Sequence, residues 1–207
     1  MNYDLFTPSG EHSRACHRIE MVDAEACLFP ALFSECEAAR LFAVLRRDIL
    51  WRQEKIRLYG KVNPLPRLTA WYGDPGTTYR YSGITAEPTP WIPALLEIRA
   101  RIEAVSGGRF NSVLLNLYRD GADSMAWHAD DEPELGRNPV IGSVSFGQSR
   151  TLQLKHKREP ANRRNIELPN GSYLLMQGAM QHHWLHQVAK SRRPLGERIN
   201  LTYRKIL

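Results

Sequence analysis

His128 and Asp130 are the first residues in the chain whose types and spacing could do chemistry. They lie two positions apart in residues 125–130, which we predict to form a β-strand. Side chains at i and i+2 of a strand point to the same face, so the imidazole and the carboxylate can reach one ion. Two histidines and one carboxylate form a set that holds non-haem iron. The pair also fits a surface histidine beside the acidic run Asp130-Asp131-Glu132.

A third ligand has to come from elsewhere, and the candidates are the histidines within residues 182–186. His186 shares a predicted strand with Trp184, whereas His182 and His183 precede that strand. One of them is enough to complete a set of three ligands. Spacing alone leaves the choice among them open.

The last predicted strand, residues 198–206, carries a second set of polar side chains. Four of them alternate with apolar residues and share one face of the strand: Arg198, Asn200, Thr202 and Arg204. Such a face usually points to water. Its two guanidiniums could instead hold a dicarboxylate through bidentate hydrogen bonds. Asn116 and Tyr118, another i, i+2 pair, could add an amide and a phenol to the same cavity.

The elements that must position these residues predict an α+β domain. One helix begins after Ser34, which has capping-box spacing to Glu37, and a second begins at Thr89-Pro90 and ends at Gly107-Gly108. After that point the hydrophobic period changes from 3.6 to 2 and predicts seven strands, at residues 111–118, 125–130, 140–146, 151–156, 172–177, 184–188 and 198–206. This order predicts a sandwich or jelly roll with the helices packed on one face.

Length and composition indicate a single globular domain. The 207 residues are 43% hydrophobic and 24% charged, which excludes a disordered, collagen-like or low-complexity chain. Residues 1–30 show weak periodicity, so we expect an N-terminal arm followed by one domain at 31–207. We find neither an apolar run of membrane-spanning length nor a signal peptide, and we expect no membrane association.

Charge and cysteine content bear on the kind of partner and on the cellular compartment. The formal net charge is +6, and twelve of the 28 Lys and Arg but only three of the 22 Asp and Glu lie from Arg150 onward. A basic C-terminal third suits a polyanionic partner and suits a solvated surface equally. Cys16, Cys27 and Cys36 form no C-x-x-C, so we expect neither a disulfide framework nor a zinc ribbon. We therefore expect a reducing compartment, cytoplasmic in a prokaryote or nuclear in a eukaryote, rather than secretion.

Taken together and in order, these motifs resemble the AlkB family of Fe(II)- and 2-oxoglutarate-dependent dioxygenases. The matching residues are Asn116-Leu-Tyr118 with Gly121, His128-Ala-Asp130-Asp131-Glu132, His186 and Arg198-Ile-Asn200-Leu-Thr-Tyr-Arg204. Each motif is weak alone, and the ordered set is specific. Similarity to the nucleic-acid repair branch rests on four further motifs: Pro66-Arg67, Tyr72-Gly73-Asp74, Tyr79-Arg80-Tyr81-Ser82-Gly83 and Pro90-Trp91-Ile92-Pro93.

The resemblance implies a double-stranded β-helix, or jelly roll, at residues 109–207. It implies that Fe(II) is held by His128, Asp130 and His186, and that a group of polar residues holds 2-oxoglutarate. In that group Arg198 would bind the distal carboxylate and Arg204 would support the end near the metal; the full group is Asn116, Tyr118, Arg198, Asn200, Thr202 and Arg204. O2 and 2-oxoglutarate would yield succinate and carbon dioxide, and an N-methyl group would leave as formaldehyde.

The resemblance also assigns nucleotide recognition to residues 51–83. Such an enzyme must extrude a base and stack it between flat side chains. Tyr79 and Tyr81 match family positions near the flipped base, with Tyr81 stacking against His128, although both also fit core packing. Leu58 and Tyr59 occupy the hairpin where duplex-acting members insert an apolar finger. Because Tyr stands there in place of Phe, the preference between duplex and single strand stays open.

Three further substrate contacts are expected. Arg67 would contact a phosphate, and Glu132 would sense a cationic methylated base. The basic stretch Lys155-His156-Lys157-Arg158, with Arg163-Arg164, would bind the phosphate backbone and make binding salt-dependent.

The main hypothesis is a monomeric oxidative demethylase of bases such as N1-methyladenine and N3-methylcytosine in DNA, with RNA left open. Two alternatives remain. The same dioxygenase chemistry could act on a protein or a small molecule, or the chain could be a non-catalytic nucleic-acid-binding module. Succinate production and metal content distinguish these alternatives.

Overall fold

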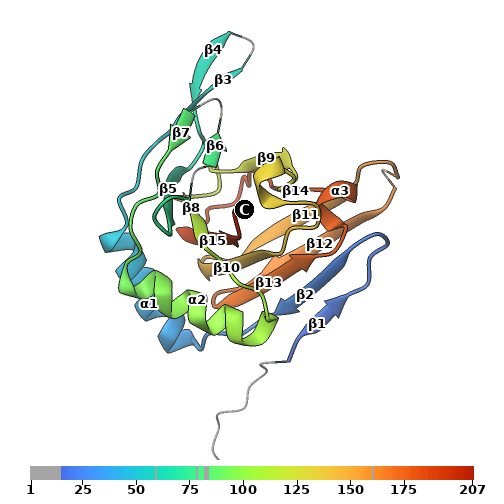
Figure 1. The fold of residues 1–207 in the computed structure, drawn as a ribbon, viewed down its shortest axis with the longest axis horizontal. Helices are drawn as coiled ribbons and strands as arrows, with labels where there is room; N and C mark the ends of the chain where they lie inside the picture. Colours follow the sequence, from blue (N-terminus) through green and yellow to red (C-terminus); the bar gives the residue numbers. More distant parts are fainter. Residues whose placement is uncertain (1–14, 59, 78, 82–83, 160) are drawn as a thin grey trace, which may run out of the picture.

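The computed structural model describes residues 15–58, 60–77, 79–81, 84–159 and 161–207, and it consists mainly of two antiparallel β-sheets (Figure 1). The larger sheet has the strand order β1 (His17–Ile19), β2 (Glu25–Phe29), β13 (Ser172–Gln177), β10 (Ile141–Gly147), β15 (Arg198–Arg204), β8 (Ser112–Tyr118) and β5 (Leu68–Gly73). The smaller sheet has the order β12 (Arg163–Leu168), β11 (Arg150–His156), β14 (Trp184–Val188) and β9 (Met125–His128). Apolar side chains of both sheets form one buried cluster between them. The predicted jelly-roll core is confirmed.

Two short hairpins project from the body of the molecule at the top of Figure 1. One joins β3 (Lys55–Leu58) to β4 (Lys61–Pro64), and the other joins β6 (Tyr79–Tyr81) to β7 (Ile84–Ala86). Both hairpins begin within residues 51–83, the region to which the resemblance assigns nucleotide recognition.

The helices α1 (Glu35–Asp48) and α2 (Pro93–Ser106) lie together against the larger sheet (Figure 1). The capping box of α1 is present: the Glu37 backbone N–H donates to Ser34 Oγ, and the Ser34 backbone N–H donates to Glu37 Oε2. Ala38, Leu41 and Leu45 form the buried face of α1. Both helices share one apolar core with the sheet, so they are scaffold for the strands that carry the polar residues.

The predicted start of α2 at Thr89-Pro90 is wrong. The backbone of Thr89 is bonded to a neighbouring strand, donating to Trp71 O and accepting from the N–H of Gly73, each at 3.1 Å. These bonds hold Thr89 in extended geometry, and the helix begins only at Pro93. Its end at Gly107 is as predicted, because Gly107 adopts the left-handed conformation (φ 66°) that closes many helices.

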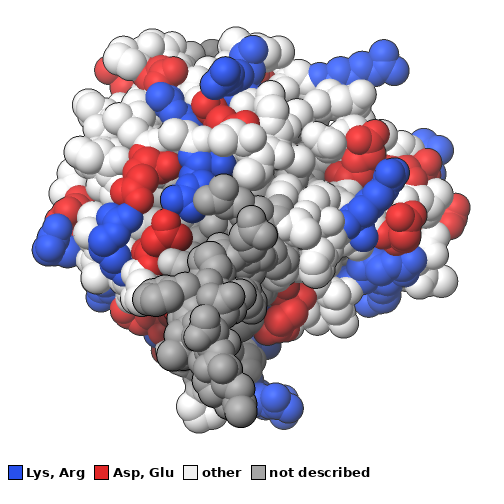
Figure 2. Space-filling view, turned by 90° about the horizontal axis from the view of Figure 1, so that it is seen from below, with Lys and Arg blue, Asp and Glu red and all other residues white. Residues whose placement is uncertain are grey.

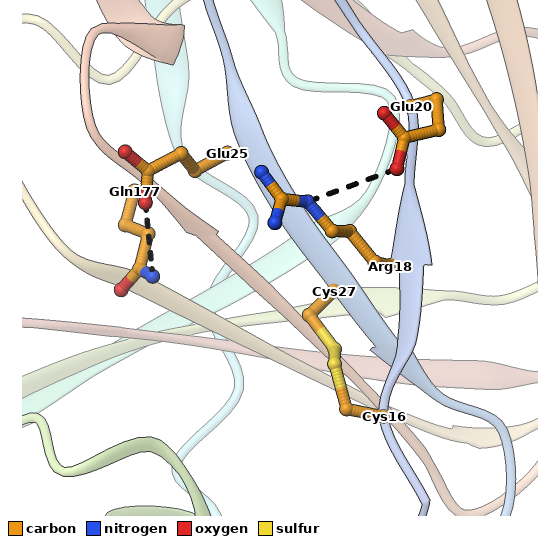
Figure 3. Close-up of a disulfide and its surroundings, with 6 residues drawn as sticks. All are labelled: Cys16, Arg18, Glu20, Glu25, Cys27 and Gln177. Atoms are coloured by element: carbon orange, nitrogen blue, oxygen red, sulfur yellow. Dashed lines mark hydrogen bonds and ion pairs between the residues drawn. A yellow bond between two sulfur atoms is a disulfide. The ribbon is translucent and has the colours of Figure 1, made fainter.

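The described part of the expected N-terminal arm lies within the larger sheet. β2 pairs with β13 over residues 25–29, and β1 pairs with β2. Cys16 and Cys27 are joined in a disulfide, with their Cα atoms 5.7 Å apart (Figure 3). We expected no disulfide framework, and this single bond was not predicted, because hairpin pairing brings together two cysteines whose spacing in the sequence carries no motif.

Within the predicted run of strands, β12 and β9 differ from the prediction. β12 was not predicted, since only Ile166 and Leu168 of its six residues are buried and its pattern is correspondingly weak. β9 ends at His128, so Asp130 lies beyond the strand rather than on it. Among the described residues, each helix is too short or too polar to cross a membrane.

Candidate active site

Three predicted ligands meet where the ends of β9 and β14 lie side by side. His128 pairs directly with His186 across the two strands, and their imidazole rings lie 4.1 Å apart. Asp130 Oδ1 lies 3.9 Å from His128 Nε2. One potential ligand atom from each of the three residues lies within 4.8 Å of the others. The geometry selects His186 for this group rather than His182 or His183.

Burial and charge set the protonation states of this group. Burial acts to raise the pKa of Asp130, but the positive charge of Arg204 and the two neighbouring imidazoles lower that pKa to about 2. Arg204 Nη2 donates to Asp130 Oδ1 at 2.6 Å. Burial lowers the pKa of His186 to about 3, and the adjacent His128 acts in the same direction. At neutral pH the site therefore presents a carboxylate and a neutral imidazole, the forms that bind metal ions.

Hydrogen bonding at the same residues fits a bound cation. His128 Nδ1 lies 2.9 Å from the carbonyl oxygen of Ala126, which can only accept, so Nδ1 carries the proton and Nε2 keeps its lone pair. Metal-ligating histidines are usually oriented by such a bond. Asp130 Oδ2 and His186 Nδ1 are buried with no hydrogen-bond partner among the described residues. The donor set suits Fe(II) held by two histidines and a carboxylate.

A second group of three potential ligands, Asp23, His156 and His183, does not fit a metal equally well. The backbone N–H of Glu159 donates to His156 Nδ1 at 3.0 Å. The proton of the neutral ring therefore lies on Nε2, the nitrogen that is 3.5 Å from Asp23 Oδ2. Because Nε2 has no free lone pair in this tautomer, we assign the metal to the group that contains His128.

A cavity adjoins the metal ligands, and its polar lining comes from β8, β10 and β15. The lining includes Asn116, Tyr118, Ser143, Arg198, Asn200, Thr202 and Arg204. Arg198 is 1% exposed and donates from Nη2 to Ser145 Oγ, whereas its Nε and Nη1 have no partner among the described residues. Burial lowers the pKa of this guanidinium. A buried cation with two unused donors is a binding site for a carboxylate.

All four polar residues of β15 are buried, so the solvent-facing interpretation of this strand is wrong. Arg198 points its guanidinium toward Tyr118, 5.1 Å from the ring centre. Asn200 Nδ2 donates to Ser143 Oγ and to Val144 O, and Thr202 Oγ1 donates to Asn200 Oδ1. Asn200 and Thr202 therefore shape the cavity wall through bonds among themselves and with β10, while Arg204 supports Asp130.

Arg67 does not occupy the position expected for a phosphate contact. It is 4% exposed, its Nε donates to Asn116 Oδ1 at 2.7 Å, and its Nη1 donates to Ser124 O. These bonds fix the side chain of Asn116, which lines the cavity. Arg67 therefore supports the cavity wall from behind, and burial keeps it from a nucleic-acid backbone.

The structure describes the other expected substrate contacts only in part. Tyr59 lies outside the described residues. Leu58, Tyr79 and Tyr81 lie on β3 and β6 of the two hairpins, and the description of these three covers the backbone alone. Glu132 precedes the 3-10 turn Pro133–Leu135 and lies two residues after the metal ligand Asp130.

The expected backbone-binding stretch divides into exposed and engaged residues. Lys157 Nζ bonds Asp131 Oδ2 at 3.0 Å and Gln181 O at 2.9 Å, and His156 is buried. Lys155 lies over the Trp127 ring, 4.4 Å from its centre. Arg158 is exposed. Lys157 is itself exposed, so its contact with a phosphate stays a prediction, with Asp131 as a competing partner.

Three residues that support the site were not singled out from the sequence. Ser145 holds Arg198, and the period-two spacing of Ser143 and Ser145 on β10 is a signal that could have revealed it. Arg150 donates to the carbonyl groups of Asp120, Asp123 and Ala189, and lies 5.5 Å from the Tyr118 ring centre. Gln181 accepts the backbone N–H of Asp130. The last two carry no pattern in the sequence.

Comparison with known proteins agrees with this geometry. Residues 25–204 match the 2OG-Fe(II) oxygenase superfamily. The chain is 41% identical over 192 residues to the rat alpha-ketoglutarate-dependent dioxygenase alkB homolog 3, covering 88% of this chain and 64% of that protein. It is 39% identical over 214 residues to the mouse DNA oxidative demethylase ALKBH2, covering 99% of this chain and 87% of that protein.

A solved structure, OsALKBH1, has the same fold. It matches with a TM-score of 0.60 and 14% identity over 90% of this chain and 99% of that one.

Proposed function

The chain belongs to the 2OG-Fe(II) oxygenase superfamily and, within it, to the AlkB family; from this premise we propose that it demethylates N-alkylated bases of nucleic acid. Its cofactor is Fe(II), and its cosubstrates are 2-oxoglutarate and O2. Relatives that cover most of the chain are named as DNA oxidative demethylases, which supports this choice of substrate.

One observation carries the proposal: the ligand group and a buried, incompletely bonded guanidinium face the same cavity. His128, Asp130 and His186 line it together with Arg198. A metal site alone would fit many reactions, and a buried arginine alone would fit many anions. Together they suit a reaction in which a dicarboxylate lies between the arginine and the metal.

The protein groups have separate tasks in this reaction. His128, Asp130 and His186 would hold Fe(II), which would supply the oxidative chemistry that hydroxylates the N-methyl carbon with O2 and 2-oxoglutarate, with release of succinate and carbon dioxide. Arg198 holds the distal carboxylate of 2-oxoglutarate, with Ser145 fixing the guanidinium. Arg204 holds Asp130 ionised and oriented. Loss of the hydroxyl proton then lets the C–N bond break, so formaldehyde leaves and the ring nitrogen keeps the electron pair.

We propose that the substrate approaches on the side of the two hairpins. The face in Figure 2, seen from below Figure 1, carries Lys and Arg interspersed with Asp and Glu and shows no continuous basic surface. The two hairpins project on the opposite side, toward the top of Figure 1. We place the nucleic acid at the hairpin side, where it would reach the cavity.

The direct test is turnover of methylated oligonucleotides. The purified chain, supplied with Fe(II) and 2-oxoglutarate, is incubated with single-stranded DNA, duplex DNA and RNA that contain N1-methyladenine or N3-methylcytosine. We expect formaldehyde and unmodified base from at least one polymer, and none from the His128→Ala variant. Succinate release with every methyl group retained would instead favour a protein or small-molecule substrate. Salt-sensitive binding without succinate would favour a non-catalytic module.

We propose that the chain acts as a monomer, since the ligand group and Arg198 all come from one chain. Light scattering after size-exclusion chromatography measures this directly. An active dimer would contradict it.

A further inference from the structure

The side chain of Gln181 accepts a hydrogen bond from the backbone N–H of the metal ligand Asp130. Gln181 lies in the short helix α3 (Met180–His183), which leads directly into β14 and His186. Its Oε1 accepts the Asp130 N–H at 3.0 Å, and the residue is 1% exposed. Gln181 therefore links the segment that carries the carboxylate ligand to the segment that carries the second histidine.

The orientation of the Gln181 amide is fixed by chemistry. An N–H can only donate, so the oxygen of the amide has to face Asp130. The amide nitrogen then points away, and it is buried with no hydrogen-bond partner among the described residues. An unpaired buried donor is costly. In this orientation the hydrogen bond to the Asp130 N–H offsets the cost of leaving the amide nitrogen unpaired.

Asp130 needs such a partner because the β-ladder has already ended. β9 stops at His128, so the N–H of Asp130 has no strand partner, and the residue is 1% exposed. Without Gln181 the buried N–H would be unsatisfied, and the backbone at Asp130 would lose a restraint that the side-chain bond from Arg204 does not replace. The carboxylate would then have to be ordered each time a metal binds.

A second contact strengthens the same link from the other side. Lys157 Nζ bonds both Asp131 Oδ2, next to the ligand, and the backbone oxygen of Gln181. The segment 130–131 is thus tied to α3 through one side-chain bond and one bridging ammonium. Of the residues in these two ties, Asp130 lines the cavity, whereas Gln181, Lys157 and Asp131 do not.

We propose that Gln181 is a positioning residue for the iron site, which sets metal affinity by holding the backbone of Asp130. Outer bonds of this kind change metal affinity by about 10- to 100-fold when they are removed. The inference rests on the iron site alone. It is independent of which nucleic acid or other substrate the enzyme uses.

The test measures metal binding without turnover. The full chain is freed of metal by chelation and titrated with Mn(II), with free Mn(II) followed by electron paramagnetic resonance. Gln181→Met keeps the length of the side chain but removes the acceptor, and we expect its Kd for Mn(II) to rise about 10- to 100-fold. Gln181→Glu keeps an acceptor oxygen in either protonation state and should stay within about threefold of the parent chain.

Controls separate positioning from a general effect on folding. Gln153→Met removes a partly buried hydrogen bond between the Gln153 and Gln187 side chains on neighbouring strands. We expect it to leave the Kd for Mn(II) unchanged. If Gln181→Met does not fold, Gln181→Asn, whose amide is one methylene too short to reach Asp130, makes the same test. An unchanged Mn(II) affinity in the variant that folds, or equal weakening in Gln181→Met and Gln181→Glu, would overturn the proposal. Failure of the demethylase assay with intact Mn(II) binding would bear on the substrate and leave this inference standing.

Discussion

Arg198 and Arg204 lie six positions apart on β15, yet their surroundings give them different roles. Arg204 is bonded to the Asp130 carboxylate, so its charge is compensated within the protein. Arg198 is bonded to the Ser145 hydroxyl and faces an aromatic ring, and among the described residues no carboxylate pairs with it. A buried cation without an anion is destabilising until a ligand supplies one. The difference identifies Arg198 as the residue that takes the incoming dicarboxylate.

Replacement of Arg198 tests this assignment. Arg198→Met should lower kcat/KM for 2-oxoglutarate by about 100-fold or more, on the order of 3 kcal/mol, because a buried charge-assisted pair is lost. Arg198→Lys keeps the charge but not the planar fork, so we expect an intermediate loss. Initial rates of succinate release at varied 2-oxoglutarate measure both variants. An unchanged KM in a folded Arg198→Met protein would contradict the assignment.

At the scale of elements, α1 shows how a local signal is reinforced by a distant contact. Glu37 closes the capping box with Ser34 and also accepts from Arg101 of α2 at 2.8 Å. The backbone N–H of Ser34 and the Arg101 guanidinium lower the pKa of Glu37 from 4.5 to about 2. One carboxylate therefore caps one helix and joins it to another.

The pKa of Glu37 predicts an acid-dependent loss of stability. Because the folded-state pKa lies below 4.5, Glu37 stabilises the fold above that pH, and the contribution is lost as the pH falls through about 2. Glu37→Gln keeps the bond to Ser34 but removes the charge. We expect it to cost about 1 kcal/mol at neutral pH, since the pair is partly solvent-exposed, and to flatten the stability curve between pH 4.5 and 2. Urea unfolding at stepped pH measures this, and a parallel loss in both proteins would refute it.

The β1–β2 hairpin at the edge of the larger sheet is closed by the disulfide Cys16–Cys27, which spans eleven positions (Figure 3). Restricting a loop of this length in the unfolded chain is worth about 2–3 kcal/mol. We expect dithiothreitol to lower the Tm of the parent chain. Cys16→Ser should have the lower Tm from the start and show no further change with the reductant. A parent Tm that is insensitive to reductant would show that the bond contributes nothing.

At the scale of the whole molecule, the face in Figure 2 carries charges of both signs. Basic and acidic residues alternate across the face in Figure 2, and Lys157 is already paired with Asp131. The basic C-terminal third therefore divides among the cavity, internal ion pairs and exposed residues such as Arg158. Only the exposed part is available to phosphates.

This division predicts a moderate salt dependence of nucleic-acid binding. With about three phosphate contacts to single-stranded DNA, the affinity should fall about tenfold or somewhat more between 50 and 200 mM salt. Arg158→Gln should reduce the slope of log K against log salt by about 0.7, the value of one contact. Lys157→Gln should change it less, because that ammonium is engaged by Asp131. Fluorescence anisotropy with a labelled oligonucleotide measures the slope for each variant and for the parent chain. If both variants keep the slope of the parent chain, neither side chain meets a phosphate.

The sequence alone determined those features that depend on neighbours along the chain. The capping box of α1 and the alternation on β15 follow from helix and strand geometry. The spacing of His128 and Asp130 marked both as ligands, although Asp130 lies beyond the end of β9. Alternation showed that Arg198 and Arg204 share a face. It could not show whether that face meets water or a cavity, because the covering sheet comes from other parts of the chain.

Only the tertiary structure decided the features that depend on residues far apart in sequence. Pairing of β9 with β14 placed His186 opposite His128, and pairing of β2 with β13 drew the N-terminal segment into the sheet. Packing of the two sheets buried Arg67 behind Asn116 and made it unavailable to a phosphate. Burial and long-range hydrogen bonds arise when distant segments pack together, and no period or spacing within one segment records which partner will be there.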